Sequence, residues 1–129
     1  MALPLLQQNT KGHYMTNAVW VKSKANTWLR LLTFNINSDL GNGVYVIWHS
    51  GNPGRVVYVG QGDIATRLQC HRNNDDIIQY SQRGELLVTW AVLPAHLMSG
   101  VERYLADTWN PLVGDAYPDV APIAVNSPW

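Results

Sequence analysis

Two short segments combine tyrosine with glycine, Gly43-Val44-Tyr45 and Tyr58-Val59-Gly60, and only twelve residues separate the two tyrosines. Glycine weakens a strand unless a bulge, a close backbone or a ligand requires it, so two such breaks in one region indicate a site. Arg67, His71 and Glu102 follow further along the chain. Together the five side chains form a mixed polar set of the kind that acid–base and electrostatic catalysis uses.

Each of these residues also has a purely structural interpretation. Tyrosine is common in strands, so Tyr45 and Tyr58 could be ordinary sheet aromatics. The arginine and the histidine could lie on a solvated helix face, and Glu102 could pair with Arg103 or with solvent. Only the combination of residues favours a site.

The composition predicts one folded domain. The chain has 129 residues, of which 47% are hydrophobic and 14% charged, and this excludes wholesale disorder. A single cysteine, Cys70, cannot form an internal disulfide, and no Cys/His set has zinc-site spacing, which favours a cytoplasmic, intracellular location. The start of the chain lacks a signal-peptide pattern and no segment approaches the length of a membrane span, so we expect no membrane association.

The zero net charge argues mildly against a dedicated nucleic-acid binder, but the charges are unevenly distributed. Before Asp39 there are four basic residues and no acid, whereas the rest of the chain carries five basic and nine acidic residues. We therefore expect residues 1–42 to form a basic N-terminal extension packed on the domain. Its lysines, which include Lys22 and Lys24, either contact phosphate or are solvated.

Residues 44–49 and 55–60 are β-rich runs separated by a cluster of turn-forming residues, which predicts an antiparallel hairpin. If His49 pairs with Gly54 across a four-residue loop, Tyr45 lies directly opposite Tyr58 on the same face. A loop one residue longer would place the tyrosines on opposite faces. The register therefore decides whether they form a unit.

Two helices and one further strand are predicted after the hairpin. Asp63 is a good N-cap for a helix over residues 64–72, which ends in the polar run 73–76 and places Arg67 and His71 on one side. Residues 86–93 predict a strand, and residues 96–109 predict a helix with Glu102 at the boundary of its apolar face. Residues 14–37 are ambiguous between a helix followed by a strand and two strands.

The order and spacing of these features resemble the GIY-YIG nuclease family. The two tripeptides, the arginine and histidine one helical turn apart, and Glu102 with Pro111 nine residues later carry the resemblance over residues 43–114. It implies an α+β fold with a small three-stranded antiparallel sheet flanked by helices. This chain adds the extra N-terminal segment and a Pro-rich C-terminal extension, residues 115–129.

Members of this family cut DNA phosphodiester bonds with one divalent metal ion, and the resemblance implies a role for each residue. Glu102 would hold Mg²⁺ or Mn²⁺, and Arg67 would neutralise charge developing on the phosphate. Tyr45 is preferred as general base, which requires that the metal and the arginine lower its pKa. Tyr58 would bind the nucleophile or share that role, and His71 would donate to the phosphate or assist proton transfer.

Further residues are expected to contact the DNA substrate. They are Gly43, Gly60, Gln61, Lys22, Lys24 and Arg72. The neutral charge also suggests a protein partner or a homodimer, and a homodimer would supply two sites for the two strands of a duplex.

The chain departs from the family pattern at three positions. Gln61 stands where many members have lysine, and Arg67 follows the second tyrosine by nine residues rather than ten. Gly114 replaces the usual asparagine, which leaves Asp115 or Asn110 as a substitute. These departures support an alternative, a non-catalytic module on the same fold that binds nucleic acid or protein. The principal prediction is a metal-dependent DNA endonuclease.

Overall fold

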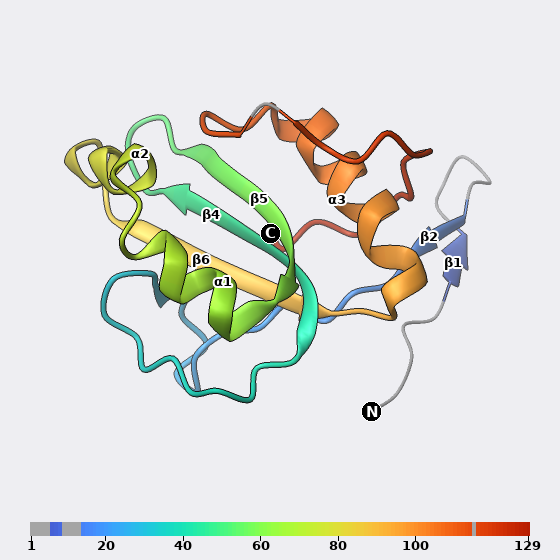
Figure 1. Ribbon diagram of the computed structural model, residues 1–129, viewed down its shortest axis with the longest axis horizontal. Coiled ribbons are helices and arrows are strands. Elements are labelled where there is room, and N and C mark those ends of the chain that lie inside the picture. The colour runs from blue at the N-terminus through green and yellow to red at the C-terminus, as the bar shows by residue number, and fades with distance from the viewer. Residues whose placement is uncertain (1–5, 9–13, 115) are drawn as a thin grey trace.

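A four-stranded antiparallel sheet in the order β3-β6-β4-β5 forms the centre of the computed structural model, which describes residues 6–8, 14–114 and 116–129 (Figure 1). Its strands are β3 (Leu29–Arg30), β4 (Asn42–His49), β5 (Arg55–Asp63) and β6 (Leu86–Val92). The helices are α1 (Ile64–His71), α2 (Asp75–Ile78), the 3-10 helix η1 (Gln79–Gln82) and α3 (Ala95–Trp109). A separate small sheet pairs β1 (Leu6–Gln8) with β2 (Tyr14–Thr16).

The structure confirms the α+β class and the elements predicted for the centre of the chain. Strands β4, β5 and β6 and helices α1 and α3 lie within a few residues of their expected ranges. Asp63 caps α1 as predicted, because its carboxylate accepts a hydrogen bond from the Thr66 amide at 3.2 Å. None of the helices in the described ranges is long and apolar enough to cross a membrane.

The prediction of three strands was wrong, because residues 1–42 contribute a fourth. In β3, Leu29 pairs with Val88 and Arg30 with Leu87 of β6. Leu31 follows with its side chain fully buried, and its amide donates to the Leu86 carbonyl at 2.9 Å. The ambiguous region 14–37 thus contains two short strands, and its described residues form no helix. Lys11, part of the predicted basic extension, lies outside the described residues.

The two short helices α2 and η1 were not predicted. The polar run 73–76 was expected only to end the first helix, but the Asn74 side chain accepts from the Asp76 amide at 3.0 Å and caps α2. Ile77 of α2 is fully buried. One buried isoleucine thus holds this segment against the domain.

Helices α1 and α3 pack on opposite faces of the sheet. Ile64 and Leu68 of α1 share an apolar cluster with Tyr45, whereas Val101 and Leu105 of α3 belong to the other cluster. Helix α1 contacts β5 and β4, and Figure 1 shows it in front of the sheet. Because β5 is an edge strand, side chains from both helices can meet around its end.

The hairpin of β4 and β5 has a different register from the one predicted. His49 pairs with Arg55 rather than Gly54, so the loop is residues 50–54. By itself this longer loop would place Tyr45 and Tyr58 on opposite faces of the sheet.

A β-bulge in β5 returns the tyrosines to one face. Beyond the bulge, Tyr58 pairs with Ile47, so Val57 is an extra residue in the strand. Tyr45 therefore lies opposite Gly60 and diagonally next to Tyr58. The tyrosines do form a unit, but through a bulge rather than through the predicted direct pairing.

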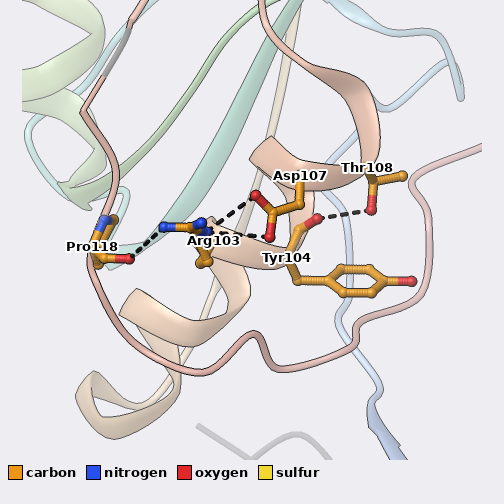
Figure 2. A network of polar contacts seen from close by, with 5 residues as sticks. All are labelled: Arg103, Tyr104, Asp107, Thr108 and Pro118. Atoms are coloured by element: carbon orange, nitrogen blue, oxygen red, sulfur yellow. Dashed lines mark hydrogen bonds and ion pairs between the residues drawn. The ribbon is translucent and has the colours of Figure 1, made fainter.

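The C-terminal extension runs back over α3 and joins the N-terminal segment. Figure 2 shows Arg103 on the polar side of α3, where it pairs with Asp107 and donates to the Pro118 carbonyl at 3.3 Å. Further along, the side-chain oxygen of Asn126 accepts from the Ala18 amide at 2.6 Å. The two segments outside the family resemblance are therefore hydrogen-bonded to each other.

Candidate active site

The five predicted catalytic residues surround the end of β5 that leads into α1. They come from four elements: Tyr45 from β4, Tyr58 from β5, Arg67 and His71 from α1, and Glu102 from α3. The tyrosines, arginine and histidine lie on the α1 face, and the glutamate approaches from the α3 face. The structure therefore brings together residues that are up to 57 positions apart, from 45 to 102.

Three rings form a compact cluster on the α1 face. The Tyr45 hydroxyl and Nε2 of His71 are hydrogen-bonded at 2.6 Å, and both residues are buried. The Tyr58 ring stacks on that of Tyr45, with centroids 6.1 Å apart, and its centroid lies 4.5 Å from that of His71. Tyr58 is only half-buried, so it is the member of the cluster that solvent reaches.

The glycines of the two tripeptides make room for protein atoms. A Cβ at Gly60 would lie 2.3 Å from the Tyr45 hydroxyl oxygen, because that ring crosses the glycine. A Cβ at Gly43 would lie 1.9 Å from the backbone oxygen of Ala91 in β6. The space in which we expected Gly43 and Gly60 to admit substrate is therefore occupied by the sheet and by Tyr45.

Replacing Gly60 by alanine should lower the free energy of unfolding by about 1–3 kcal/mol, the usual cost of overpacking. The new methyl group would displace the Tyr45 ring and break its hydrogen bond with His71. Urea denaturation measures the change. Gly54→Ala is the matched control, because its nearest neighbour is one backbone oxygen at 3.0 Å in an exposed loop. Equal losses in both variants would contradict the prediction.

Gln61 links the α1 and α3 sides of the site. Its backbone carbonyl accepts from Nε of Arg67 at 3.3 Å, and its side-chain amide donates to Oγ of Ser99 at 3.1 Å. The same side chain hydrogen-bonds Glu102, which is only 7% exposed. Sequence reasoning missed Ser99, although its position three residues before the glutamate on a predicted helix could have identified it.

Burial has the largest effect on protonation in the site. It raises the pKa of Tyr45, and the charge of Tyr58 raises it further, against a smaller lowering by Arg67. This direction is opposite to the one that a general base requires. Burial lowers the pKa of His71 to about 4, assisted by the charge of Arg67. It raises the pKa of Glu102 to about 7, although a neighbouring amide and Arg67 oppose it.

His71 and Glu102 make opposite contributions to the pH dependence of stability. The pKa of His71 falls from 6.5 to about 4 on folding, so its contribution is present above pH 6.5 and is lost as pH falls towards 4. The pKa of Glu102 rises from 4.5 to about 7, so its contribution is present below pH 4.5 and is lost as pH rises through 7. In the wild type the two effects offset each other over the shared range.

Single variants should therefore reveal opposite slopes. With Glu102→Gln, the free energy of unfolding should fall by up to about 3 kcal/mol between pH 7 and pH 4, because the His71 effect is no longer offset. With His71→Gln it should rise by a similar amount over the same change. Urea denaturation at a series of pH values measures both slopes. If both variants follow the wild-type curve, these groups are not the titrating ones.

Three residues predicted to contact the substrate, Arg72, Lys22 and Lys24, are not linked to the site. Arg72 ties α1 to the N-terminal segment, because Nε donates to the Leu31 carbonyl at 2.6 Å and Nη2 donates to that of Phe34. Nζ of Lys22 lies 4.3 Å from the ring centroid of Trp28. Lys24 is exposed in the loop before β3. The described contacts thus link none of the three to the five catalytic candidates.

The segment after α3 returns to the site at Gly114. This glycine has a φ of +97°, and a Cβ on it would lie 3.4 Å from the Tyr58 ring. Asn110, one possible substitute for the family asparagine, forms the left-handed C-cap of α3. Asp115, the other substitute, lies outside the described residues.

The donor chemistry fits one hard divalent cation. No group of three or more His, Cys, Asp or Glu able to hold a metal occurs in the described part of the chain, so a metal here would depend on one carboxylate. The ion pairs found among the described residues do not involve Glu102, whose buried charge a cation would compensate. Mg²⁺ commonly uses one or two carboxylates and completes its shell with water and phosphate oxygens. Glu102 could hold Mg²⁺ or Mn²⁺ in this way.

Comparisons of the chain with protein-family models, with curated proteins and with solved structures gave no match. The resemblance to GIY-YIG nucleases is therefore carried by the residues of this chain and by their spacing.

Proposed function

We propose that this protein is a metal-dependent endonuclease that hydrolyses DNA phosphodiester bonds. One observation carries the proposal: four separate elements place a tyrosine–histidine hydrogen bond, a second tyrosine, an exposed arginine and a buried glutamate around the end of one edge strand. Acid–base groups, a phosphate-binding cation and a metal-binding carboxylate are the parts that phosphodiester hydrolysis needs.

Glu102 would hold the divalent cation, with Gln61 fixing the carboxylate through their hydrogen bond. When bound, that ion supplies Lewis-acid stabilisation of the phosphoryl oxygens. Arg67 is exposed, and its Nε is fixed by the Gln61 carbonyl, so its terminal nitrogens can bind the phosphate from the solvent side.

We assign the attacking water to Tyr58 rather than to Tyr45. Tyr45 is fully buried, its pKa is raised, and its hydroxyl is hydrogen-bonded to His71. Tyr58 is half-exposed and packs against both rings, so it can meet a water molecule while Tyr45 and His71 hold it in place. His71 is neutral at pH 7, because burial lowers its pKa, and Nε2 shares a hydrogen bond with the Tyr45 hydroxyl, which holds the two rings together.

Incubation of the wild-type protein with supercoiled plasmid and Mg²⁺ or Mn²⁺ tests the proposal. One site with one cation cuts one strand, so nicked circles should form first, and a chelator should prevent them. Glu102→Gln, purified in parallel, distinguishes the protein's own activity from a contaminant. Salt-sensitive binding of DNA without any cleavage would instead identify a non-catalytic nucleic-acid-binding module.

Linear product should appear later, either because the protein binds the nicked DNA a second time and cuts the other strand, or because a homodimer supplies two sites. Light scattering with and without DNA distinguishes these two routes.

A further inference from the structure

A cavity of about 440 Å³ lies at the loop end of the β4–β5 hairpin, away from the predicted catalytic residues. We call it the tryptophan pocket. Its lining residues are Trp28, Trp48, Gly54, Arg55, Val56, Trp109 and Trp129. Its volume falls within the range of about 300–1,000 Å³ that is usual for small-ligand sites. The proposed cleavage reaction assigns no role to these four tryptophans.

The indole rings form a continuous aromatic surface. Trp48 and Trp129 have centroids 4.8 Å apart, and Trp109 stacks on Trp129 at 5.2 Å with 27° between the planes. Trp28 meets Trp48 edge-on at 5.2 Å. Trp129 remains 55% exposed, although an apolar side chain of this size is normally covered. A flat aromatic ligand would cover it by stacking.

The charges around the pocket favour an anionic ligand. Arg55 lines it, and Lys22 lies over the Trp28 ring, whereas none of the described residues that line it is acidic. A quaternary ammonium ligand, the other usual occupant of a tryptophan cage, would be repelled by both cations. A nucleotide combines an aromatic base with a negative phosphate and so matches both features.

Helix α3 carries one residue of the tryptophan pocket and one of the proposed active site. Trp109 follows Glu102 by seven residues, so it lies on the same face of α3 about 10 Å further along the helix. A second hollow lies at the C-terminal end of α3 and is lined by Ala106, Asp107, Asn110, Pro111, Gly114 and Tyr117. The Asn110 carbonyl accepts from Nη2 of Arg55 at 3.3 Å, which joins the two hollows.

We propose that the tryptophan pocket binds an unpaired base in a single-stranded segment of the DNA substrate. A base in a duplex is stacked on both faces and paired along one edge, so it cannot enter a pocket of this kind. The proposal rests on the proposed nuclease function, and it specifies substrates with single-stranded or displaced segments.

Fluorescence anisotropy with a labelled oligothymidylate and a blunt hairpin duplex, both in chelator, tests binding without cleavage. The wild type should bind the single strand more tightly than the duplex. Trp129→Ala should weaken binding of the single strand at least about fivefold, which corresponds to the loss of one stacked base. Arg55→Gln should also weaken it and should reduce the slope of log K against log salt by about 0.7.

Val120→Ala and Arg83→Gln are matched controls, because both replace exposed residues outside the pocket. Near-ultraviolet circular dichroism of each variant checks that the domain remains folded. If the duplex binds as tightly as the single strand, or if Arg55→Gln and a folded Trp129→Ala bind as well as the controls, the proposal is overturned. Pocket-dependent binding with no cleavage of any DNA would overturn the nuclease function and leave the base-binding site standing.

Discussion

Replacing Glu102 by glutamine should reduce Mg²⁺-dependent cleavage of DNA at least about a hundredfold. The amide has nearly the same shape as the carboxylate and can keep the hydrogen bond with Gln61, but it carries no charge to hold a cation. The fold should tolerate the change, because burial already disfavours the charged form of this residue. Plasmid nicking rates at several Mg²⁺ concentrations measure the effect.

The pH dependence of the cleavage rate provides a second test of the role of Glu102. Protons and cations compete for the Glu102 carboxylate, whose pKa is raised to about 7 by burial, so wild-type cleavage should increase as the pH rises through neutrality. A higher Mg²⁺ concentration should move this profile to lower pH. Glu85→Gln is the matched control, since Glu85 is an exposed glutamate paired with Arg30 on the sheet edge. Equal cleavage by Glu102→Gln and Glu85→Gln would refute the role of Glu102.

The sequence predicted the hairpin but could not predict its register. Turn-forming residues between two β-branched runs are a strong local signal, and both strands form where expected. The bulge at Val57 has no such signal, because valine is an ordinary strand residue. The bulge places both Tyr45 and Tyr58 on the α1 face, where they pack in one apolar cluster. That packing exists only in the assembled sheet, so the local sequence does not reveal it.

The fourth strand was missed for a similar reason. Strand β3 has only two residues, too few to show the alternation on which strand prediction depends. It is held by pairing with β6, whose nearest residue in the sequence is more than fifty positions away. Pairing between residues so far apart in the sequence cannot be predicted from the local pattern of hydrophobic and polar residues.

Helical spacing identified the pair Arg67 and His71, because residues four apart share a face. Arg72 directly follows His71 and therefore points in another direction around the helix. It reaches the N-terminal segment instead of the site. The tryptophan pocket has no local signal at all, because its rings come from four segments spread between residues 28 and 129.

Replacing Arg67 by alanine should lower kcat about 10²–10³-fold, with a smaller change in KM. The guanidinium is exposed and fixed at Nε, so its charge and its forked donors are available to the phosphate as negative charge develops. Arg67→Lys should recover only part of the loss, because an ammonium lacks the planar fork. Single-turnover cleavage of a defined oligonucleotide measures the chemical step separately from product release.

The loss of Arg67 should also change the pH dependence of cleavage. The charge of Arg67 lowers the pKa of Glu102, so its loss should shift the pH profile of the remaining activity upward. Arg83→Ala is the matched control, because that exposed arginine packs over the ring of Tyr80, which belongs to η1 and not to the site. If Arg67→Ala raises KM while kcat stays unchanged, the arginine contributes only uniform binding of the phosphate, and charge stabilisation must come from other residues.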